Sequence, residues 1–183
     1  MSMLTLTSIG SRAFAKNLPK PQLHFFQDDG IVPNNKLPLL LYRGAFEERK
    51  EKGASWLEQK FLSNNWYNSW RNGIFTFQHY HSITHEVLGI YSGEALVLLG
   101  GDKGAKVTVN AGDIIVIPAG VGHKNLGDHD LGVVGAYPNG MDVDIMRCEP
   151  GERPRVDQNI AAVPFPNEDP FVGKTGGLLE AWK

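Results

Sequence analysis

Histidines and a glutamate gather in one short stretch of the chain, residues 72–93, which reads NGIFTFQHYHSITHEVLGIYSG. His79 and His81 are two residues apart, so in an extended strand their side chains point to the same face. Two neighbouring buried imidazoles need partners for both ring nitrogens, and a metal ion satisfies them more readily than backbone carbonyls do. Glu86, across a short turn, can add a carboxylate oxygen from the next strand. The stretch therefore predicts a metal site.

A further histidine follows a predicted strand in a second stretch, which reads AGDIIVIPAGVGHKNLG. Pro118 ends this strand without deleting a ladder hydrogen bond, and Gly120 permits a turn with positive φ. In an antiparallel barrel a later strand can return beside an earlier one, so we expect His123 to face His79 and His81.

These two stretches resemble the two motifs of the cupin superfamily. The first motif runs glycine, five residues, His-x-His, four residues, glutamate, six residues, glycine, and its fixed positions are filled by Gly73, His79, His81, Glu86 and Gly93. The second runs glycine, five residues, Pro-x-Gly, two residues, histidine, three residues, asparagine, and its positions are filled by Gly112, Pro118, Gly120 and His123. Gly127 stands where that motif has asparagine, and Asn125 comes two residues earlier. That asparagine is not usually a ligand, so the departure concerns a turn more than the metal.

The resemblance implies one divalent metal inside a jelly-roll-like barrel, held by His79, His81, Glu86 and His123. Nitrogen and oxygen ligands without thiolate suit Mn, Fe, Co, Ni, Zn or Cu. More loosely, the likeness extends over the predicted strands of residues 37–138, and the whole chain is similar to a group of uncharacterised single-domain cupins.

Two classes of function follow from such a site. Three imidazoles and one carboxylate fill four positions of an octahedron and leave two for substrate, water or dioxygen, which indicates a metalloenzyme. A divalent metal and one carboxylate leave a net positive charge at the site, which favours an anionic or enolisable small molecule. The reaction would then be an oxygenation, a decarboxylation or an isomerisation. The alternative is a non-catalytic small-molecule-binding or storage protein. We favour the enzyme because all four ligands are intact, and no further catalytic residue is assigned.

The rest of the chain predicts an all-β fold. Short runs such as HEVLGIYSG, AKVTVNAG and DIIVIPAG are rich in β-branched residues and are separated by glycine or proline at the spacing of a sandwich or barrel. We expect an N-terminal arm over residues 1–36, an antiparallel jelly-roll-like barrel over 37–148 with FTFQHYH as one strand, and a proline-rich extension over 149–183 packed on the barrel. A short helix is expected near residues 47–62.

Composition narrows the partners. Lys and Arg number 18 against 20 Asp and Glu, so no basic excess indicates nucleic acid, and no run is apolar enough to predict a membrane span. The single cysteine, Cys148, excludes a multi-thiolate site and is assigned no catalysis. The basic, acid-free residues 1–20 are expected to form an arm in a cytoplasmic protein, with an organellar targeting segment as the alternative. Sheet edges and extended termini predict a homodimer.

Other conspicuous side chains are given structural roles. His129 is expected in a solvated turn, and His85 on the opposite strand face from Glu86, outside the direct ligands, with a supporting or substitute role left open. Tyr80 and Gln78 are expected to point outward. The apolar pocket is expected to be lined by Phe75, Phe77, Leu88 and Ile90. The segment NNWYNSWRNG is expected to be a loop, either a lid or interface or, more simply, a satellite core.

Overall fold

The computed structural model describes residues 20–183, so the first part of the expected N-terminal arm, which carries the alternative targeting segment, falls outside them apart from Lys20. Its strands are β1 Gln22–His24, β2 Leu39–Tyr42, β3 Trp66–Asn72, β4 Glu86–Leu99, β5 Ala105–Asn110, β6 Ile114–Ile117 and β7 His123–Pro138. Its helices are α1 Lys50–Ser63, α2 Arg155–Ala162 and α3 Leu178–Ala181. Among these described residues no helix is long and apolar enough to cross a membrane.

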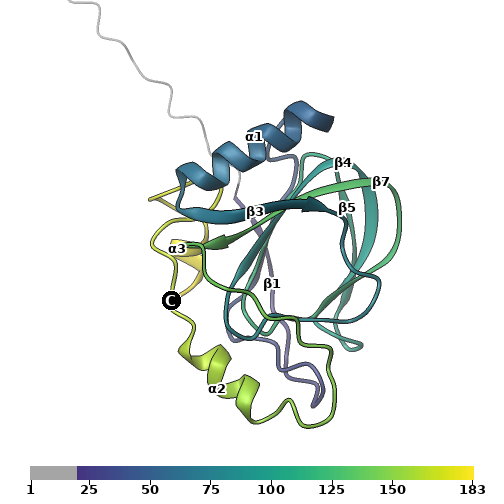
Figure 1. Ribbon diagram of the computed structural model, residues 1–183, viewed down its shortest axis with the longest axis vertical. Coiled ribbons are helices and arrows are strands. Elements are labelled where there is room, and N and C mark those ends of the chain that lie inside the picture. The colour runs from purple at the N-terminus through teal and green to yellow at the C-terminus, as the bar shows by residue number, and fades with distance from the viewer. Residues whose placement is uncertain (1–19) are drawn as a thin grey trace, which may run out of the picture.

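The strands pair antiparallel in the order β1-β2-β6-β4-β7-β3, with β5 added against the second half of β4. The long strands β4 and β7 pair from Val87–Ala136 to Leu99–His123, and register shifts around Ser92 bend them. Because β4 and β7 bend, the two halves of this strand pair lie on different sides of the barrel, and the sheet curls on itself (Figure 1). The predicted antiparallel jelly-roll-like barrel with a short helix is confirmed.

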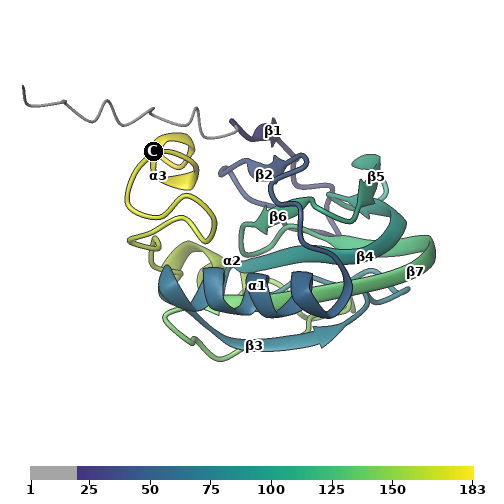
Figure 2. The ribbon, with the colours of Figure 1, turned by 90° about the horizontal axis from the view of Figure 1, so that it is seen from above.

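Both faces of the central strands are covered. In β2, Leu39 and Leu41 face the barrel interior, whereas Leu40 and Tyr42 face an outer core beneath α1 and the C-terminal segment. This two-sided burial explains why β2 and β6 read as continuous apolar runs rather than as alternating ones. Figure 2 shows α1 along the outside of the barrel, beside β3, β4 and β7.

Helix α1 packs closely on β4. Its buried residues are Gly53, Ala54, Leu57 and Phe61, spaced as one face of a helix. Gly89 of β4 makes this approach possible, since a Cβ there would lie 2.4 Å from a methyl carbon of Leu57. The observed helix begins at Lys50, slightly later than the sequence predicts.

Two strand predictions were wrong. Residues 73–78 form no strand, and the segment pairs with its neighbours through isolated bridges, His79 with His123 and Tyr80 with Met146. Single backbone hydrogen bonds, such as that from the Asn125 N–H to the Phe75 carbonyl at 2.8 Å, add to these bridges without forming a continuous ladder. Conversely, the expected loop contains β3, an edge strand that pairs with β7 and places Trp66 in the outer core.

The C-terminal residues pack against the outside of the barrel and bury side chains there. Tyr80 points away from the barrel interior as expected, yet it is fully buried, and its hydroxyl donates to a Glu152 carboxylate oxygen at 2.6 Å. Trp182 is buried as well, and its indole N–H donates to the Pro38 carbonyl at 2.8 Å. Residues outside the barrel therefore enclose side chains that strand alternation alone directs outward.

Candidate metal centre

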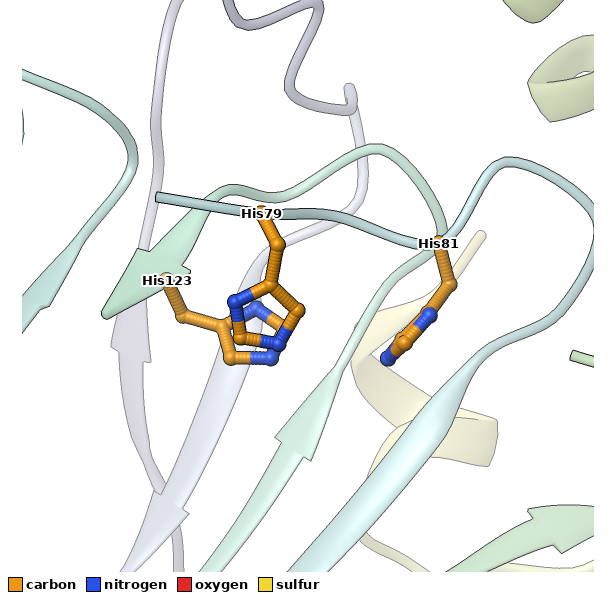
Figure 3. Close-up of side chains that lie close together, drawn as sticks. All are labelled: His79, His81 and His123. Carbon is orange, nitrogen blue, oxygen red and sulfur yellow. The ribbon is translucent and has the colours of Figure 1, made fainter. Parts of the chain in front are cut away.

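Three imidazoles converge inside the barrel. His79 and His81 come from the irregular segment before β4, and His123 begins β7. Two backbone hydrogen bonds join these segments, from the His79 N–H to the His123 carbonyl at 3.2 Å and from the His123 N–H to the His79 carbonyl at 2.9 Å. One ring nitrogen of each histidine lies within 4.8 Å of those of the other two, and all three residues are buried (Figure 3).

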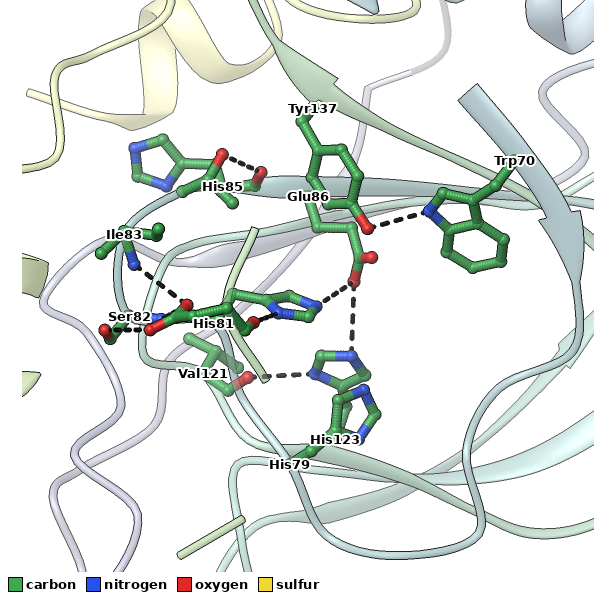
Figure 4. Close-up of polar contacts among 12 residues, drawn as sticks. Trp70, His79, His81, Ser82, Ile83, His85, Glu86, Val121, His123 and Tyr137 are labelled. Carbon is green, nitrogen blue, oxygen red and sulfur yellow. Dashed lines mark hydrogen bonds and ion pairs between the residues drawn. The ribbon is translucent and has the colours of Figure 1, made fainter. Parts of the chain in front are cut away.

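Glu86 completes the group from the first residue of β4. It shares the interior face with Leu88 and Ile90, as strand alternation requires, and its register opposite Ile117 fixes its depth. Its Oε2 atom lies 3.4 Å from Nε2 of His81 and 3.4 Å from Nε2 of His123 (Figure 4). The structure thus brings the four predicted ligand residues together.

The other nitrogen of each imidazole faces a backbone carbonyl. Nδ1 of His79 lies 3.2 Å from the Phe77 oxygen, Nδ1 of His123 lies 3.1 Å from the Val121 oxygen, and Nδ1 of His81 contacts the Asp144 oxygen. A carbonyl only accepts, so each Nδ1 must carry the proton and donate it. In a neutral ring this leaves Nε2 with a lone pair, which is the arrangement of metal-ligating histidines.

These donor atoms fit a bound cation. Within the described part of the chain, His81 Nε2 and Glu86 Oε2 are buried without any hydrogen-bond partner. A carboxylate oxygen beside two nitrogen lone pairs is repelled by them unless a proton or a metal ion lies between. Three nitrogens and one oxygen without thiolate are a donor set for a divalent transition metal.

Burial and mutual charge determine the protonation of the side chains themselves. Burial, followed by repulsion from His123 and His81, lowers the pKa of His79 to about 3, so this ring is neutral near pH 7. Burial alone would raise the pKa of Glu86, but the adjacent imidazoles outweigh it and hold that pKa well below its usual range. Burial likewise opposes charge on His81, whereas Glu86 favours it and raises the pKa of His81 overall. The carboxylate is therefore ionised and ready to bind a cation.

A cavity of about 210 Å³ opens above these groups. Its walls are mainly aromatic and aliphatic, and are formed by Trp70, Asn72, Gly73, Ile74, Phe75, Leu88, Tyr137, Val143 and Ile145. Among the described lining residues there is no lysine or arginine. Any negative charge on a molecule in this cavity would have to be balanced at the candidate metal centre.

Tyr137 and Trp70 bring a polar group into this apolar wall. The Tyr137 hydroxyl accepts a hydrogen bond from the Trp70 indole N–H at 2.9 Å (Figure 4). Burial, reinforced by the negative charge of Glu86, raises the pKa of Tyr137 above its ordinary value. The hydroxyl keeps its proton and can donate it. No sequence motif marks Tyr137, and Trp70 was assigned to packing or a lid.

Asp144 is a second feature that the sequence did not reveal. Its carbonyl accepts from His81, while its carboxylate accepts from the Ser82 N–H at 2.7 Å and from the Ser82 hydroxyl. One residue from the segment after β7 therefore fixes both the ring of His81 and the backbone beside it.

The remaining sequence predictions have mixed outcomes. Phe75 lies at the cavity mouth and is 41% exposed, so it is not core, and Phe77 stacks on it at 4.8 Å without lining the cavity. Leu88 does line the cavity, and Ile90 lies in the interior core. His129 is exposed, as predicted.

His85 lies outside the three-histidine group but is buried, not on the surface. Burial lowers its pKa to about 4, so the ring is neutral. Cys148 is half-buried, and burial raises the pKa of its thiol to about 11, which makes it a poor nucleophile.

The antiparallel barrel, with its two motifs directed at one interior point, is a cupin-type fold. More specifically, the chain belongs to the family of the uncharacterized protein YjlB of Bacillus subtilis (strain 168). The two are 42% identical over 163 residues, which span 88% of this chain and 96% of that protein. No family model matches the chain.

Solved structures share only parts of the fold. Acireductone dioxygenase from Bacillus anthracis, with cadmium in its active centre, is 18% identical over 49% of this chain and 60% of its own, with a TM-score of 0.37. Bacillus subtilis oxalate decarboxylase, a protein with Mn(II) centres, is 20% identical over 63% of this chain and 29% of its own, with a TM-score of 0.36. Procruciferin, an 11S globulin from Brassica napus, is 23% identical over 42% and 21%, with a TM-score of 0.33.

Proposed function

We propose that this protein is a divalent-metal-dependent enzyme that acts on a small, largely apolar substrate bearing an anionic or enolisable oxygen group. One observation carries the proposal. Ring nitrogens of the three imidazoles and an ionised Glu86 oxygen meet in the wall of an apolar cavity, while carbonyls hold the opposite ring nitrogens. His79, His81, Glu86 and His123 would hold the ion.

When bound, such an ion supplies Lewis-acid polarisation of a substrate oxygen. Its double positive charge exceeds the single negative charge of Glu86, so the centre favours an anion or an enolate. Because no lysine or arginine is among the described lining residues, this excess charge would select the substrate's oxygen group.

The cavity walls define the rest of the substrate. Ile74, Leu88, Val143 and Ile145 contribute aliphatic surface that excludes water and takes up an apolar substituent. A volume of about 210 Å³ is below the ~300–1,000 Å³ common for drug-sized ligands. The substrate is therefore small, with a chelating end at the histidines and an apolar end toward Phe75.

Tyr137 is placed to hold a proton at the edge of the site. Its oxygen already accepts from Trp70, so its own proton is free for the Glu86 side or for a substrate oxygen. We assign it the role of proton donor. A proton donor beside an ionised carboxylate is what acid–base chemistry on a substrate requires, and this observation supports the enzyme over the non-catalytic alternative.

Metal content and turnover measured together test the proposal. Protein purified without a histidine tag should contain one equivalent of a divalent transition metal, and His81→Ala should contain almost none. A panel of keto acids, diketones and phenols should include a substrate that the wild type converts and His81→Ala does not. His129→Ala, at an exposed position, is the matched control and should keep metal and turnover. Metal content unchanged in His81→Ala would refute the site, and full metal without turnover on the panel would favour the binding protein.

A further inference from the structure

A second cavity, of about 720 Å³, lies outside the barrel between the segment after β1 and the segment of α2. Figure 1 shows the segment after β1 and helix α2 at the same end of the molecule. Aromatic and aliphatic side chains from both sides line it, among them Phe25, Phe26, Leu37, Ile160 and Phe165. Phe25 and Phe165 are 64% and 58% exposed. Its volume lies within the range of ligand pockets.

His85 supplies a buried donor to this cavity. It precedes Glu86 and points to the opposite side of β4, away from the three imidazoles (Figure 4). Its Nδ1 accepts a hydrogen bond from the Ala119 N–H at 3.0 Å, so Nε2 must carry the ring proton. Within residues 20–183, that Nε2 is buried and makes no well-formed hydrogen bond, although the Pro164 backbone lies close enough to raise the pKa of the ring slightly against the effect of burial. The ring packs at a tilt against Trp182, with 4.7 Å between the ring centroids.

The charged groups around the cavity balance one another. Arg153 pairs with Asp28 at 2.6 Å and with Asp157 at 2.8 Å, and so joins the two walls. Lys36 is the remaining charged residue among the described lining groups. The charge balance of this cavity therefore gives little preference for a multiply charged ligand, in contrast to the candidate metal centre.

We propose that this cavity is a second small-molecule site, which binds a neutral aromatic compound through a carbonyl acceptor for the His85 Nε2–H. The aromatic part would lie between the exposed rings of Phe25 and Phe165. His85 is only 2% exposed, so a small molecule reaches its donor more readily than a flat protein surface does. An acceptor would satisfy a polar group that is otherwise desolvated and unpaired.

The cavity wall is continuous with the turn that presents His123. The Asn35 side-chain amide donates to the Ala119 carbonyl at 2.7 Å, and the Asn34 N–H donates to the Gly120 carbonyl at 3.0 Å. The Ala119 N–H in turn binds His85. The Ala119 amide and the Trp182 indole N–H are therefore natural reporters of this cavity, whereas the Trp70 indole reports on the metal-side cavity.

A nuclear magnetic resonance titration of the full chain, with zinc added, tests the proposal. Acetophenone is the probe, and toluene is the matched aromatic compound without an acceptor. We expect saturable shifts of the Ala119 amide and the Trp182 indole, with acetophenone bound about tenfold more tightly than toluene. Ala161→Trp, at an exposed position of the cavity rim, should abolish these shifts, and Leu126→Trp, at an exposed position of β7, should not.

Several results would overturn it. These are an absence of saturable shifts at Ala119 and Trp182, shifts confined to the Trp70 indole, or shifts unchanged in Ala161→Trp. Equal affinity for toluene would remove the role of His85 as donor. Shifts that depend on protein concentration without any probe would show that a second copy of the chain covers the cavity. Because zinc is kept constant throughout the titration, shifts of the reporters follow the added probe and do not depend on a change in metal binding.

Discussion

Replacing Glu86 by glutamine tests the candidate metal centre with little disturbance of packing. Glutamine has nearly the same shape, and its amide N–H can donate to the lone pair on Nε2 of His81 or His123, each 3.4 Å from the present oxygen. The substitution removes the negative charge that attracts a cation. We therefore expect Glu86→Gln to fold but to bind metal weakly.

The size of the effect follows from ligand linkage. Free metal at one hundred times its Kd stabilises the folded state by about 2.7 kcal/mol. For a chain of 183 residues this raises Tm by about 5–11 °C. Loss of groups that merely support a ligand costs ~10–100-fold in affinity, so loss of the carboxylate charge should cost at least ~100-fold. At the same metal concentration the stabilisation then falls to about 0.4 kcal/mol, a rise of only about 1–2 °C.

Differential scanning calorimetry with and without zinc measures this difference directly. The free zinc concentration is set from the wild-type Kd, obtained first by competition titration. His129→Ala is the control, since its side chain is exposed and it should show the full wild-type rise. A rise in Glu86→Gln as large as that of the wild type would refute the reasoning, because the carboxylate would then contribute nothing to binding.

Further predictions concern catalysis, packing, pH and assembly. Tyr137→Phe should keep stoichiometric metal but lower kcat by about 10²–10⁴-fold if Tyr137 donates the proton; unchanged kcat would exclude that role. Gly89→Ala should destabilise the fold by about 1–3 kcal/mol in urea unfolding, because its Cβ would meet Leu57 at 2.4 Å, and an unchanged midpoint would contradict this close contact. In chelator-treated protein, the lowered pKa of His79 makes the unfolded state bind the extra proton between pH 6.5 and about 3. The contribution of the neutral His79 ring to the free energy of unfolding is therefore lost as the pH falls, by up to about 1.4 kcal/mol per pH unit. Urea titrations at several pH values should show this slope in the wild type and not in His79→Leu. Light scattering should give twice the 20.2 kDa chain mass, and the mass of a single chain would contradict the predicted homodimer.

The sequence was most informative where spacing alone determines geometry. The residues of the two cupin motifs bring His79, His81, Glu86 and His123 together, because alternation within an extended backbone and one Pro-x-Gly turn suffice to aim them. Gly120 shows why the turn needs glycine. Its φ is +85°, and a Cβ there would lie 2.6 Å from the Asn34 carbonyl oxygen.

Alternation was least informative about what covers the outer face of the barrel. It directed Tyr80 and His85 away from the interior, and both do point away from it, yet both are buried by the C-terminal segment. Only tertiary contacts from far along the chain decide this. The same limit applies to the metal-side cavity, whose walls include Tyr137, Val143 and Ile145, residues that no local pattern connects to the histidines.

The three histidines differ in how their rings are fixed, and this difference has a consequence for the site. His79 and His123 each donate Nδ1–H to the carbonyl two residues earlier, so extended backbone at each position fixes the ring locally. His81 instead donates to Asp144, which belongs to the segment after β7 and also holds Ser82. That segment carries two cavity-lining residues, Val143 and Ile145, as well. A substrate that displaces Val143 or Ile145 would therefore change the orientation of the His81 ring while leaving the rings of His79 and His123 fixed.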